Sequence, residues 1–211
     1  DNCNGVTNEV NGDACTLYYY DLDSDNYGDK TKSPVCMCAA DPSKKLTALK
    51  GGDCNDDSQA ISPSNVENCL TTDDDNCNGS NNDIGGLGCE KFYPDKDKDG
   101  FGASDANGAC LCAPDAANFL TSTKATDCDD GNDKVKPGIK DTCATAGVDD
   151  NCDGTTDGED SNACTTYYYD GDHDGAGSGA SRCLCKPDAD KKYDAKVSGD
   201  CNDNNAAIKP G

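Results

Sequence analysis

The chain has 211 residues, of which 41 are acidic and only 18 are lysine or arginine, and its formal net charge at pH 7 is -23. This balance argues against nucleic acid as a partner, because phosphate contacts need clustered basic side chains. No apolar run is long enough to cross a membrane, no signal peptide is visible, and apolar side chains are too scarce for hydrophobic burial alone to hold the fold together.

Cysteine and aspartate dominate the composition. The 17 cysteines are typical of a disulfide scaffold, which indicates an oxidising, extracellular or cell-surface location. Only four of the acidic residues are glutamate, and aspartate is the acid that favours turns and metal loops. About six to nine divalent cations would offset roughly 12 to 18 negative charges, so the bare net charge does not indicate a disordered chain.

A repeat organises the whole sequence. The phrase DNCNG begins at Asp1 and Asp75, and DNCDG begins at Asp150, so the period is 74 and then 75 residues. We expect three units, which comprise residues 1–74, 75–149 and 150–211. The third unit has five cysteines instead of six because the sequence ends before the sixth. Truncation explains the odd cysteine better than a free reactive thiol does, and the register of the repeat invites a longer array or a head-to-tail assembly.

Within each unit, turn-forming residues come first and a short strand follows. The strand segments are rich in aromatic residues and threonine, and they cover residues 16–20, 90–93 and 165–169. A second β-like segment contains a Cys-x-Cys pair and covers residues 34–38, 109–112 and 182–185. An aspartate-rich loop separates the two segments, so the simplest local structure is a hairpin that this loop closes.

Each of these hairpin loops has the residue pattern of a calcium loop. Aspartates stand at loop positions 1, 3 and 5, where short carboxylates suit a hard cation, and position 7 offers a backbone carbonyl. The carboxylates are Asp21, Asp23, Asp25, Asp95, Asp97, Asp99, Asp170, Asp172 and Asp174, and the carbonyls belong to Tyr27, Phe101 and Ala176. Position 12, which is a bidentate glutamate in an EF-hand, is Lys32, Ala106 or Ser181 here. The missing carboxylate must therefore come from elsewhere in the repeat.

A later segment of each unit, which we call the acidic segment, supplies candidates for that ligand. It reads DCNDD at 53–57, DCDDGND at 127–133 and DCNDNN at 200–205. Its candidate ligands are Asp53, Asn55, Asp56, Asp127, Asp129, Asp130, Asp200, Asn202 and Asp203. We expect the fourth residue of each segment, namely Asp56, Asp130 or Asp203, to face the hairpin loop. A single helical turn capped by aspartate is the alternative interpretation.

The segments that join the units contain a further loop of the same kind, which we call the linker loop. Its candidate ligands are Asp74, Asn76, Asn78, Asp149, Asn151, Asp153 and Asp157. Asn78-Gly79-Ser80 is also an N-glycosylation sequon, so glycans are candidate partners, although Asn78 stands where a ligand is expected.

Disulfide pairing is left open by the sequence, because six cysteines allow fifteen pairings. If the Cys-x-Cys segments are strands, their two sulfurs point to opposite faces and different partners. Proximity suggests Cys69 with Cys77 and Cys143 with Cys152, which leaves Cys3 without a partner. Soft-metal binding by Cys-x-Cys pairs is the alternative.

Taken together, the motifs DCDDGNDKVKPG, DDNCDGTTDGE and YYYDGDHDGAG stand in an order that resembles the metal-binding repeat named after the methanotroph surface protein MopE. The hairpin loops also resemble thrombospondin type 3 calcium repeats. The resemblance implies calcium binding in a secreted bacterial protein. Copper would need histidine or available sulfur, whereas this chain has one histidine, His173, which we expect to be exposed, and one methionine, Met37.

These observations predict a small irregular fold, mainly loop with short β-hairpins, as three tandem disulfide-stapled repeats in an elongated array with about two to three Ca²⁺ ions per repeat. The predicted function is an extracellular structural repeat that forms a stalk, fibre or surface filament with copies of itself, head to tail. A secreted metal-buffering or adhesion module on a larger cell-surface protein is the alternative. We expect no enzyme, because no catalytic set can be assembled from one histidine and a repeated loop.

Overall fold

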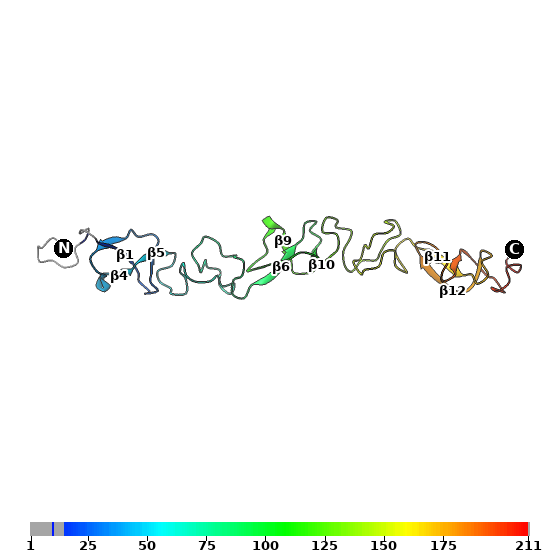
Figure 1. The fold of residues 1–211 in the computed structure, drawn as a ribbon, viewed down its shortest axis with the longest axis horizontal. Coiled ribbons are helices and arrows are strands. Elements are labelled where there is room, and N and C mark those ends of the chain that lie inside the picture. Colours follow the sequence, from blue (N-terminus) through cyan, green and yellow to red (C-terminus); the bar gives the residue numbers. More distant parts are fainter. Residues whose placement is uncertain (1–9, 11–14, 211) are drawn as a thin grey trace, which may run out of the picture. The chain divides into compact units, whose positions relative to one another are not determined.

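The computed structural model describes residue 10 and residues 15–210 (Figure 1). This part of the chain contains only short strands, two 3₁₀ turns and loops, and no helix in it could span a membrane. The elements are β1 (Thr16–Tyr20), β2 (Tyr27–Asp29), β3 (Val35–Met37), η1 (Pro42–Lys44), β4 (Leu46–Ala48), β5 (Lys50–Asp53), β6 (Glu90–Pro94), β7 (Gly102–Ala103), β8 (Ala109–Leu111), η2 (Ala116–Asn118), β9 (Leu120–Ser122), β10 (Ala125–Asp127), β11 (Thr165–Tyr169), β12 (Ala176–Leu184), β13 (Tyr193–Ala195) and β14 (Val197–Ser198). The prediction of a mainly loop structure with short β-hairpins is therefore confirmed.

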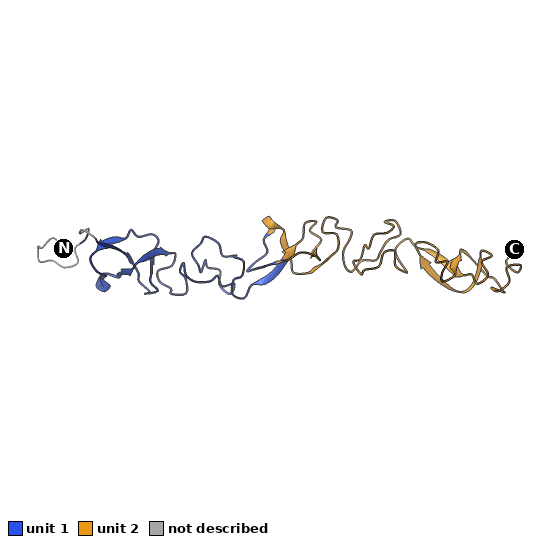
Figure 2. Ribbon diagram, in the orientation of Figure 1, with its two compact units in different colours: residues 1–92, 109–115 blue, residues 93–108, 116–211 orange. Residues whose placement is uncertain are grey.

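The chain forms two compact units (Figure 2). Unit 1 comprises residues 1–92 and 109–115, and unit 2 comprises residues 93–108 and 116–211. The boundary runs through strand β6. Its first residues pair with β8 inside unit 1, and its last residues pair with β9 inside unit 2.

One strand arrangement occurs three times. The aromatic strands β1, β6 and β11 each pair antiparallel with two later strands, which are β3 and β4, β8 and β9, and β12 and β13. The residues that follow each loop also form a parallel pair with the strand before the acidic segment: β2 with β5, β7 with β10, and β12 with β14. The predicted strands at 16–20, 90–93 and 165–169 are confirmed, and the parallel pair brings the acidic segment beside the loop.

A glycine makes the close approach of these parallel pairs possible. A Cβ atom built on Gly102 would lie 2.7 Å from Cβ of Tyr93 and 2.9 Å from the carbonyl oxygen of Pro94. The equivalent glycines, Gly28 and Gly177, show the same conflict at 2.3 and 2.5 Å for their nearest atoms. The backbone after each loop therefore packs directly on the aromatic strand, with no room for a side chain.

Apolar side chains make only a small part of the interior. The buried apolar residues include Met37, Phe92 and Leu111, whereas aspartates are buried at least as deeply, for example Asp53 and Asp127 at 1% exposure. Buried carboxylates that lack a counter-charge oppose folding. The fold therefore needs a source of stability other than hydrophobic burial.

Among the described residues, seven disulfides provide part of that stability. They join Cys15–Cys36, Cys54–Cys77, Cys69–Cys112, Cys89–Cys110, Cys128–Cys152, Cys143–Cys185 and Cys164–Cys183. Three of them close a hairpin within one repeat, and the other four join neighbouring repeats. In the Cys-x-Cys pairs at 110–112 and 183–185, the two cysteines bond to different partners, as the alternation of a strand predicts.

The pairings that proximity suggested, Cys69 with Cys77 and Cys143 with Cys152, are wrong. The amide of Cys69 donates to the carbonyl of Leu87 at 2.9 Å and places this cysteine beside Cys112. Sγ of Cys77 instead accepts from the amide of Cys54 at 3.1 Å. Short sequence separation fails as a guide because the residues between the two cysteines form the linker loop. Cys3 lies outside the described residues, within which Cys38 and Cys201 are the exposed free cysteines.

We predict that Gly102→Ala lowers the unfolding free energy by about 1–3 kcal/mol, because the new methyl group overpacks against Tyr93 and Pro94. Gly131→Ala is the matched control, since its Cβ would meet nothing closer than 3.8 Å. Denaturant unfolding of the oxidised protein measures both variants. Equal stability of the two would show that the parallel pair is not closely packed.

Candidate metal centres

The hairpin loops share one backbone conformation. Position 4 has positive φ in all three, at Ser24 (70°), Lys98 (66°) and His173 (63°). Position 6 is also left-handed, and it is glycine in two loops and asparagine, Asn26, in the first. Glycine and asparagine adopt this conformation at least cost, and position 6 is where a calcium loop makes its sharp turn.

Backbone hydrogen bonds fix one oxygen of each loop carboxylate. In the first loop, Oδ1 of Asp21 accepts from the amide of Ser24 at 2.7 Å, and Oδ1 of Asp23 accepts from that of Asp25 at 3.1 Å. Oδ1 of Asp25 in turn accepts from the amide of Tyr27 at 2.7 Å. The other loops repeat the pattern with small variations. The loop thus orients its carboxylates before any ion binds.

In most aspartates of the hairpin loops, and in several of the acidic segments, the second carboxylate oxygen is buried and has no hydrogen-bond partner among the described residues. These oxygens are Oδ2 of Asp23, Asp25, Asp53, Asp56, Asp97, Asp99, Asp127, Asp174 and Asp200, together with both side-chain oxygens of Asp172. Buried polar atoms are almost always satisfied. A set of orphaned carboxylate oxygens at the predicted ligand positions therefore fits a cation.

The acidic segment closes over each hairpin loop. Oδ1 of Asp56 accepts from the amide of Leu22 at 2.8 Å, and Asp130 and Asp203 make the same contact with Lys96 and Gly171, at 2.9 and 3.0 Å. The structure thus places the fourth residue of each acidic segment against loop position 2. The segment forms hydrogen-bonded turns and no helix, and its first aspartate accepts from the amide two residues later. The aspartate cap that the alternative interpretation expected is thus present, and it does not exclude metal binding.

In the first hairpin, the carboxylates gather in two overlapping clusters. Oxygens of Asp21, Asp23 and Asp56 lie within 4.8 Å of one another, and so do oxygens of Asp23, Asp25 and Asp53. The second hairpin gathers Asp95, Asp97 and Asp99 in the same way. Asp23 belongs to both clusters of the first hairpin, so its carboxylate could serve two neighbouring cation positions.

The third residue of each acidic segment behaves differently. Asn55, Asp129 and Asn202 are exposed. Their backbone amides, rather than their side chains, serve the site, because each donates at 2.8 Å to Oδ1 of the buried aspartate two residues earlier. The predicted carbonyl donors begin or directly precede the parallel strands, at Tyr27, Phe101 and Ala176.

Lysines offset only part of this negative charge. Lys96 lies 2.9 Å from Oδ2 of Asp130, and Lys136 lies 3.7 Å from Oδ2 of Asp99. Lys32 lies 4.0 Å from Oδ2 of Asp56. The side chains of Lys96 and Lys32 are largely exposed, and exposed pairs contribute little stability.

Burial disfavours the charged form of the clustered carboxyls. Desolvation, and then the charges of Asp25, Asp23 and Asp56, raise the pKa of Asp53 from 3.8 to about 6. Desolvation is also the main cause of the raised pKa of Asp23, Asp127 and Asp172. Mutual repulsion adds to it in each case. A cation would reverse both effects.

The linker loops have the same backbone conformation as the hairpin loops. Position 4 is a cysteine with positive φ, Cys77 (58°) or Cys152 (57°), and position 6 is a left-handed glycine. Oδ1 and Oδ2 of Asp74 accept from the amides of Asn78 and Gly79 at 3.0 and 2.8 Å, and Asp149 repeats these contacts. The structure therefore supports the weaker sequence signal at 74–79 as a loop of the same type.

Two further acidic positions near the linker loop were missed by the sequence analysis. Glu67 is 2% exposed, and neither of its carboxylate oxygens is in hydrogen-bonding geometry with a donor, although the amide of Asp75 lies close enough to oppose the rise in its pKa. Desolvation is the main cause of that rise. Its counterpart Asp141 accepts instead from the amides of Asn151 and Gly158, at 3.3 and 3.0 Å. Recurrence of an acid before Cys69 and Cys143 was the available signal.

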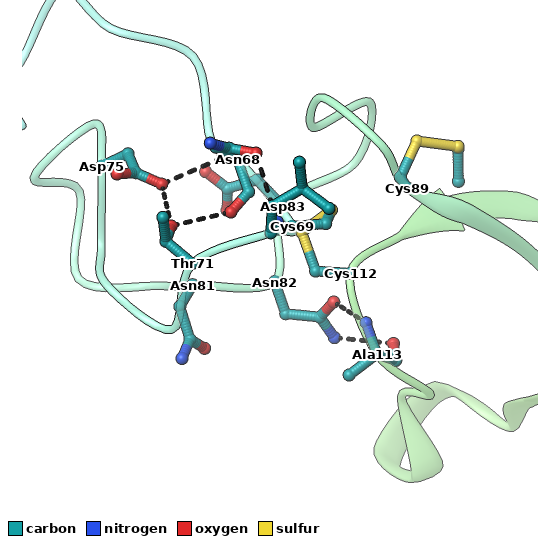
Figure 3. Close-up of a disulfide and its surroundings, with 12 residues drawn as sticks. Asn68, Cys69, Thr71, Asp75, Asn81, Asn82, Asp83, Cys89, Cys112 and Ala113 are labelled. Atoms are coloured by element: carbon teal, nitrogen blue, oxygen red, sulfur yellow. Dashed lines mark hydrogen bonds between the residues drawn. A yellow bond between two sulfur atoms is a disulfide. The ribbon is translucent and has the colours of Figure 1, made fainter. Parts of the chain in front are cut away.

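Asp75, which was also missed, has a structural role (Figure 3). Its Oδ2 accepts from the amide of Asn68 at 3.1 Å and from the hydroxyl of Thr71 at 2.7 Å. On the other side of the Cys69–Cys112 bridge, the side chain of Asn82 pairs with both backbone groups of Ala113, at 2.8 and 3.0 Å. These contacts fix the segment that leads from one hairpin to the next.

Asp157 is the remaining candidate of the second linker loop, and only one of its carboxylate oxygens has a hydrogen-bond partner among the described residues. One of its oxygens accepts from the amide of Gly147 at 3.1 Å, and the other is buried without a partner among the described residues. Asn78 lies exposed, and its side-chain amide contacts Asp83.

The described cysteines beside the carboxylates of the first two hairpins are joined in disulfides. Cys54 and Cys77 lie near Asp53, but they are joined in a disulfide. His173 is exposed, as expected, and its Nδ1 lies 3.1 Å from Asp194. The alternative of soft-metal binding by the Cys-x-Cys pairs is therefore wrong for the pairs at 110–112 and 183–185, which are fully engaged in disulfides.

Comparison with known proteins finds one family. The family model Cu-binding_MopE, described as a "putative metal-binding motif", matches residues 53–83, 127–158 and 200–211. The matches cover the acidic segments and the linker loops, and they recur in step with the three repeats. No curated protein and no solved structure matches.

We predict that the metal-free oxidised protein becomes more stable as the pH falls from about 7 to 5. The pKa of Asp53 is about 6 in the fold, whereas its ordinary value is 3.8, so the folded state takes up the proton first and gains stability in this window. Urea unfolding at several pH values in chelator measures the effect.

Asp53→Asn should remove part of this pH dependence, because an amide does not titrate. With calcium present, acidification should have the opposite effect, because protons compete with the ion. A metal-free stability that falls between pH 7 and 5 would contradict the assignment.

Proposed function

Because the chain carries three copies of a metal-binding motif, we propose that it is an extracellular, calcium-stabilised structural repeat protein that forms a stalk, fibre or surface filament by head-to-tail continuation of the repeat. The observation that carries this proposal is the convergence of carboxylate oxygens from the hairpin loop and the acidic segment that are buried and have no hydrogen-bond partner among the described residues. A fold with this interior is incomplete without bound cations.

Calcium suits these donors better than other metals. The donors are carboxylate and carbonyl oxygens, which hard cations prefer, and the loops offer more oxygens than the six that magnesium takes in strict octahedral geometry. Copper and zinc favour imidazole or thiolate, whereas the described cysteines beside the carboxylates of the first two hairpins are joined in disulfides.

The clusters support a stoichiometry of two to three ions per repeat. In the first hairpin, one ion would lie among Asp21, Asp23 and Asp56, and a second among Asp23, Asp25 and Asp53. The linker loop, with its identical backbone turn, would hold a third.

Bound calcium would stabilise the interior of this protein in place of a large hydrophobic core. Each ion replaces repulsion among three or more carboxylates with attraction, and extracellular modules of this kind bind calcium at roughly 10⁻⁴ to 10⁻³ M. Such affinities suit a medium in which calcium is always present, as the disulfides suit an oxidising one. A structural role also explains why the same site is repeated and why we propose no catalytic activity.

Removal of calcium from the oxidised protein should lower the melting temperature by more than about 10 °C, since each ion at 100 times its Kd contributes about 2.7 kcal/mol. Circular dichroism melts and protease resistance in EDTA, with calcium added back, measure this loss. Identical melting curves in EDTA and calcium would disprove the structural role. Magnesium serves as the control cation and should not restore stability at equal concentration.

Asp23→Asn should weaken calcium binding at two sites at once, because Asp23 belongs to both clusters of the first hairpin. Calorimetry should show two sites weakened at least tenfold, about 1.4 kcal/mol each. Asp57→Asn is the matched control, because Asp57 is an exposed aspartate directly after Asp56 and should bind calcium like the unmodified protein. Loss of a single site would contradict the sharing of Asp23.

A further inference from the structure

A buried acid stands at the same place before each linker loop. These two residues, which we call the linker acids, are Glu67 and Asp141, and each comes two residues before a cysteine that bonds to the next repeat. They are 2% and 3% exposed. Acidic side chains are almost never buried this fully unless they are paired or coordinate a metal, so their burial requires a partner.

The backbone holds both linker acids in the same way. The carbonyl of Glu67 accepts from the amide of Leu87, and the carbonyl of Asp141 accepts from that of Asn162, both at 2.7 Å. In the first copy, the amide of Cys69 donates back to the carbonyl of Leu87 at 2.9 Å. The segment that follows the linker loop thus fixes the linker acid before any ion binds.

In the second copy, the linker acid and the linker loop line one pocket. Asp141 shares this pocket with Asn151, Asp153 and Thr155, which stand at positions 3, 5 and 7 of the linker loop. These positions supply ligands in a calcium loop. The linker acid therefore faces the ligand positions from outside the loop, a role that position 12 has within an EF-hand.

In the first copy, Glu67 also lies against its linker loop. Both of its carboxylate oxygens are buried and have no hydrogen-bond partner among the described residues. Desolvation is the main cause of its raised pKa, and the charges of Asp75, Asp74 and Asp83, which stand at positions 2, 1 and 10 of the loop, add to the rise. A buried carboxylate that three others repel lies where a cation is attracted.

The first linker loop is also short of negative charge. Each hairpin loop has aspartates at positions 1, 3 and 5, whereas this loop has Asp74, Asn76 and Asn78 there. The side-chain amides of both asparagines donate to Oδ2 of Asp83, and Oδ1 of each accepts one backbone amide. A carbonyl oxygen has two lone pairs, so one on each asparagine remains for a cation. Because ligand charge sets calcium affinity, a loop with one carboxylate gains much from a second.

We propose that Glu67 is the closing calcium ligand of the first linker loop, and that Asp141 has this role in the second loop. The other side-chain ligands of the first site are Asp74, Asn76 and Asn78. The proposal rests on the linker ion of the proposed function and identifies the residue that completes its site. The ion then ties the end of one repeat to the beginning of the next.

Calcium calorimetry on the full oxidised chain tests the role of Glu67. Glu67→Gln should weaken one calcium site at least about tenfold, because the amide keeps the size of the side chain and removes its charge. Glu90→Gln is the matched control, since Glu90 is an exposed glutamate, and it should bind calcium like the unmodified protein. A Cys69–Cys112 peptide in mass spectrometry shows that this region has folded in both variants.

A double variant determines whether Glu67 and Asp74 bind the same ion. Asp74→Asn should weaken one site, and the combination of Glu67→Gln with Asp74→Asn should affect that same site and no other. Full calcium binding by Glu67→Gln, or two weakened sites in the double variant, would overturn the proposal.

Melting curves distinguish a metal ligand from a buried acid with a structural role. In EDTA, Glu67→Gln should melt at the same temperature as the unmodified protein or higher, because the substitution removes a buried, repelled charge. In calcium, the same variant should melt at a lower temperature than the unmodified protein. An equal loss in both media would show that Glu67 stabilises the fold without binding the ion, and would refute the proposal.

The same measurements separate this inference from the proposed function. If Glu67→Gln binds the full complement of calcium and still loses stability in EDTA, the closing ligand is refuted and the calcium-stabilised repeat stands. If the unmodified protein neither binds calcium nor loses stability in EDTA, both are refuted.

Discussion

Repulsion among buried carboxylates is the constraint on which this structure depends. Position 1 of each hairpin loop and the first residue of each acidic segment are aspartates with at most 6% exposure, and they occupy the interior that aliphatic side chains fill in ordinary domains. Burying one unpaired carboxylate costs several kcal/mol, and each hairpin buries several within a few ångströms of each other. The nearby lysines offset only part of this charge, and the proposed cations would supply the rest.

The disulfides and the parallel strand pairs solve a different problem, which is to bring the two halves of each site together. The acidic segment begins about thirty residues after the start of the hairpin loop. A parallel strand pair such as β2–β5 holds the two segments side by side. Bridges that close 19 to 24 residues each remove chain entropy worth about 3 kcal/mol from the unfolded state. Disulfides and backbone pairing thus position the two halves of each site, and the aspartate side chains remain available as metal ligands.

Much of the local structure could be predicted from the sequence, because repetition makes each motif visible several times. The aromatic strands, the loop conformation and the placement of Asp56, Asp130 and Asp203 follow from alternation and ligand spacing. The disulfide pairing could not be predicted, since it depends on contacts between neighbouring repeats that folding creates, such as the hydrogen bond from the amide of Ser62 to the carbonyl of Asp75. Glu67 and Asp75 were missed for a related reason. Their surroundings are created by folding, and no loop pattern marks them.

The cysteine at position 4 of each linker loop belongs both to the turn of the loop and to a disulfide bridge. Cys77 and Cys152 adopt the left-handed turn that shapes the loop, and the same residues carry the bridges to Cys54 and Cys128. An ion held in the loop and the oxidised bridge therefore favour the same backbone conformation. If the linker loop binds the proposed ion, thermodynamic reciprocity requires that the ion and the bridge strengthen each other. Loss of the ion would then make the bridge easier to reduce, and reduction would weaken ion binding. Under this proposal, reduction and metal removal together would destabilise the chain more than either treatment alone.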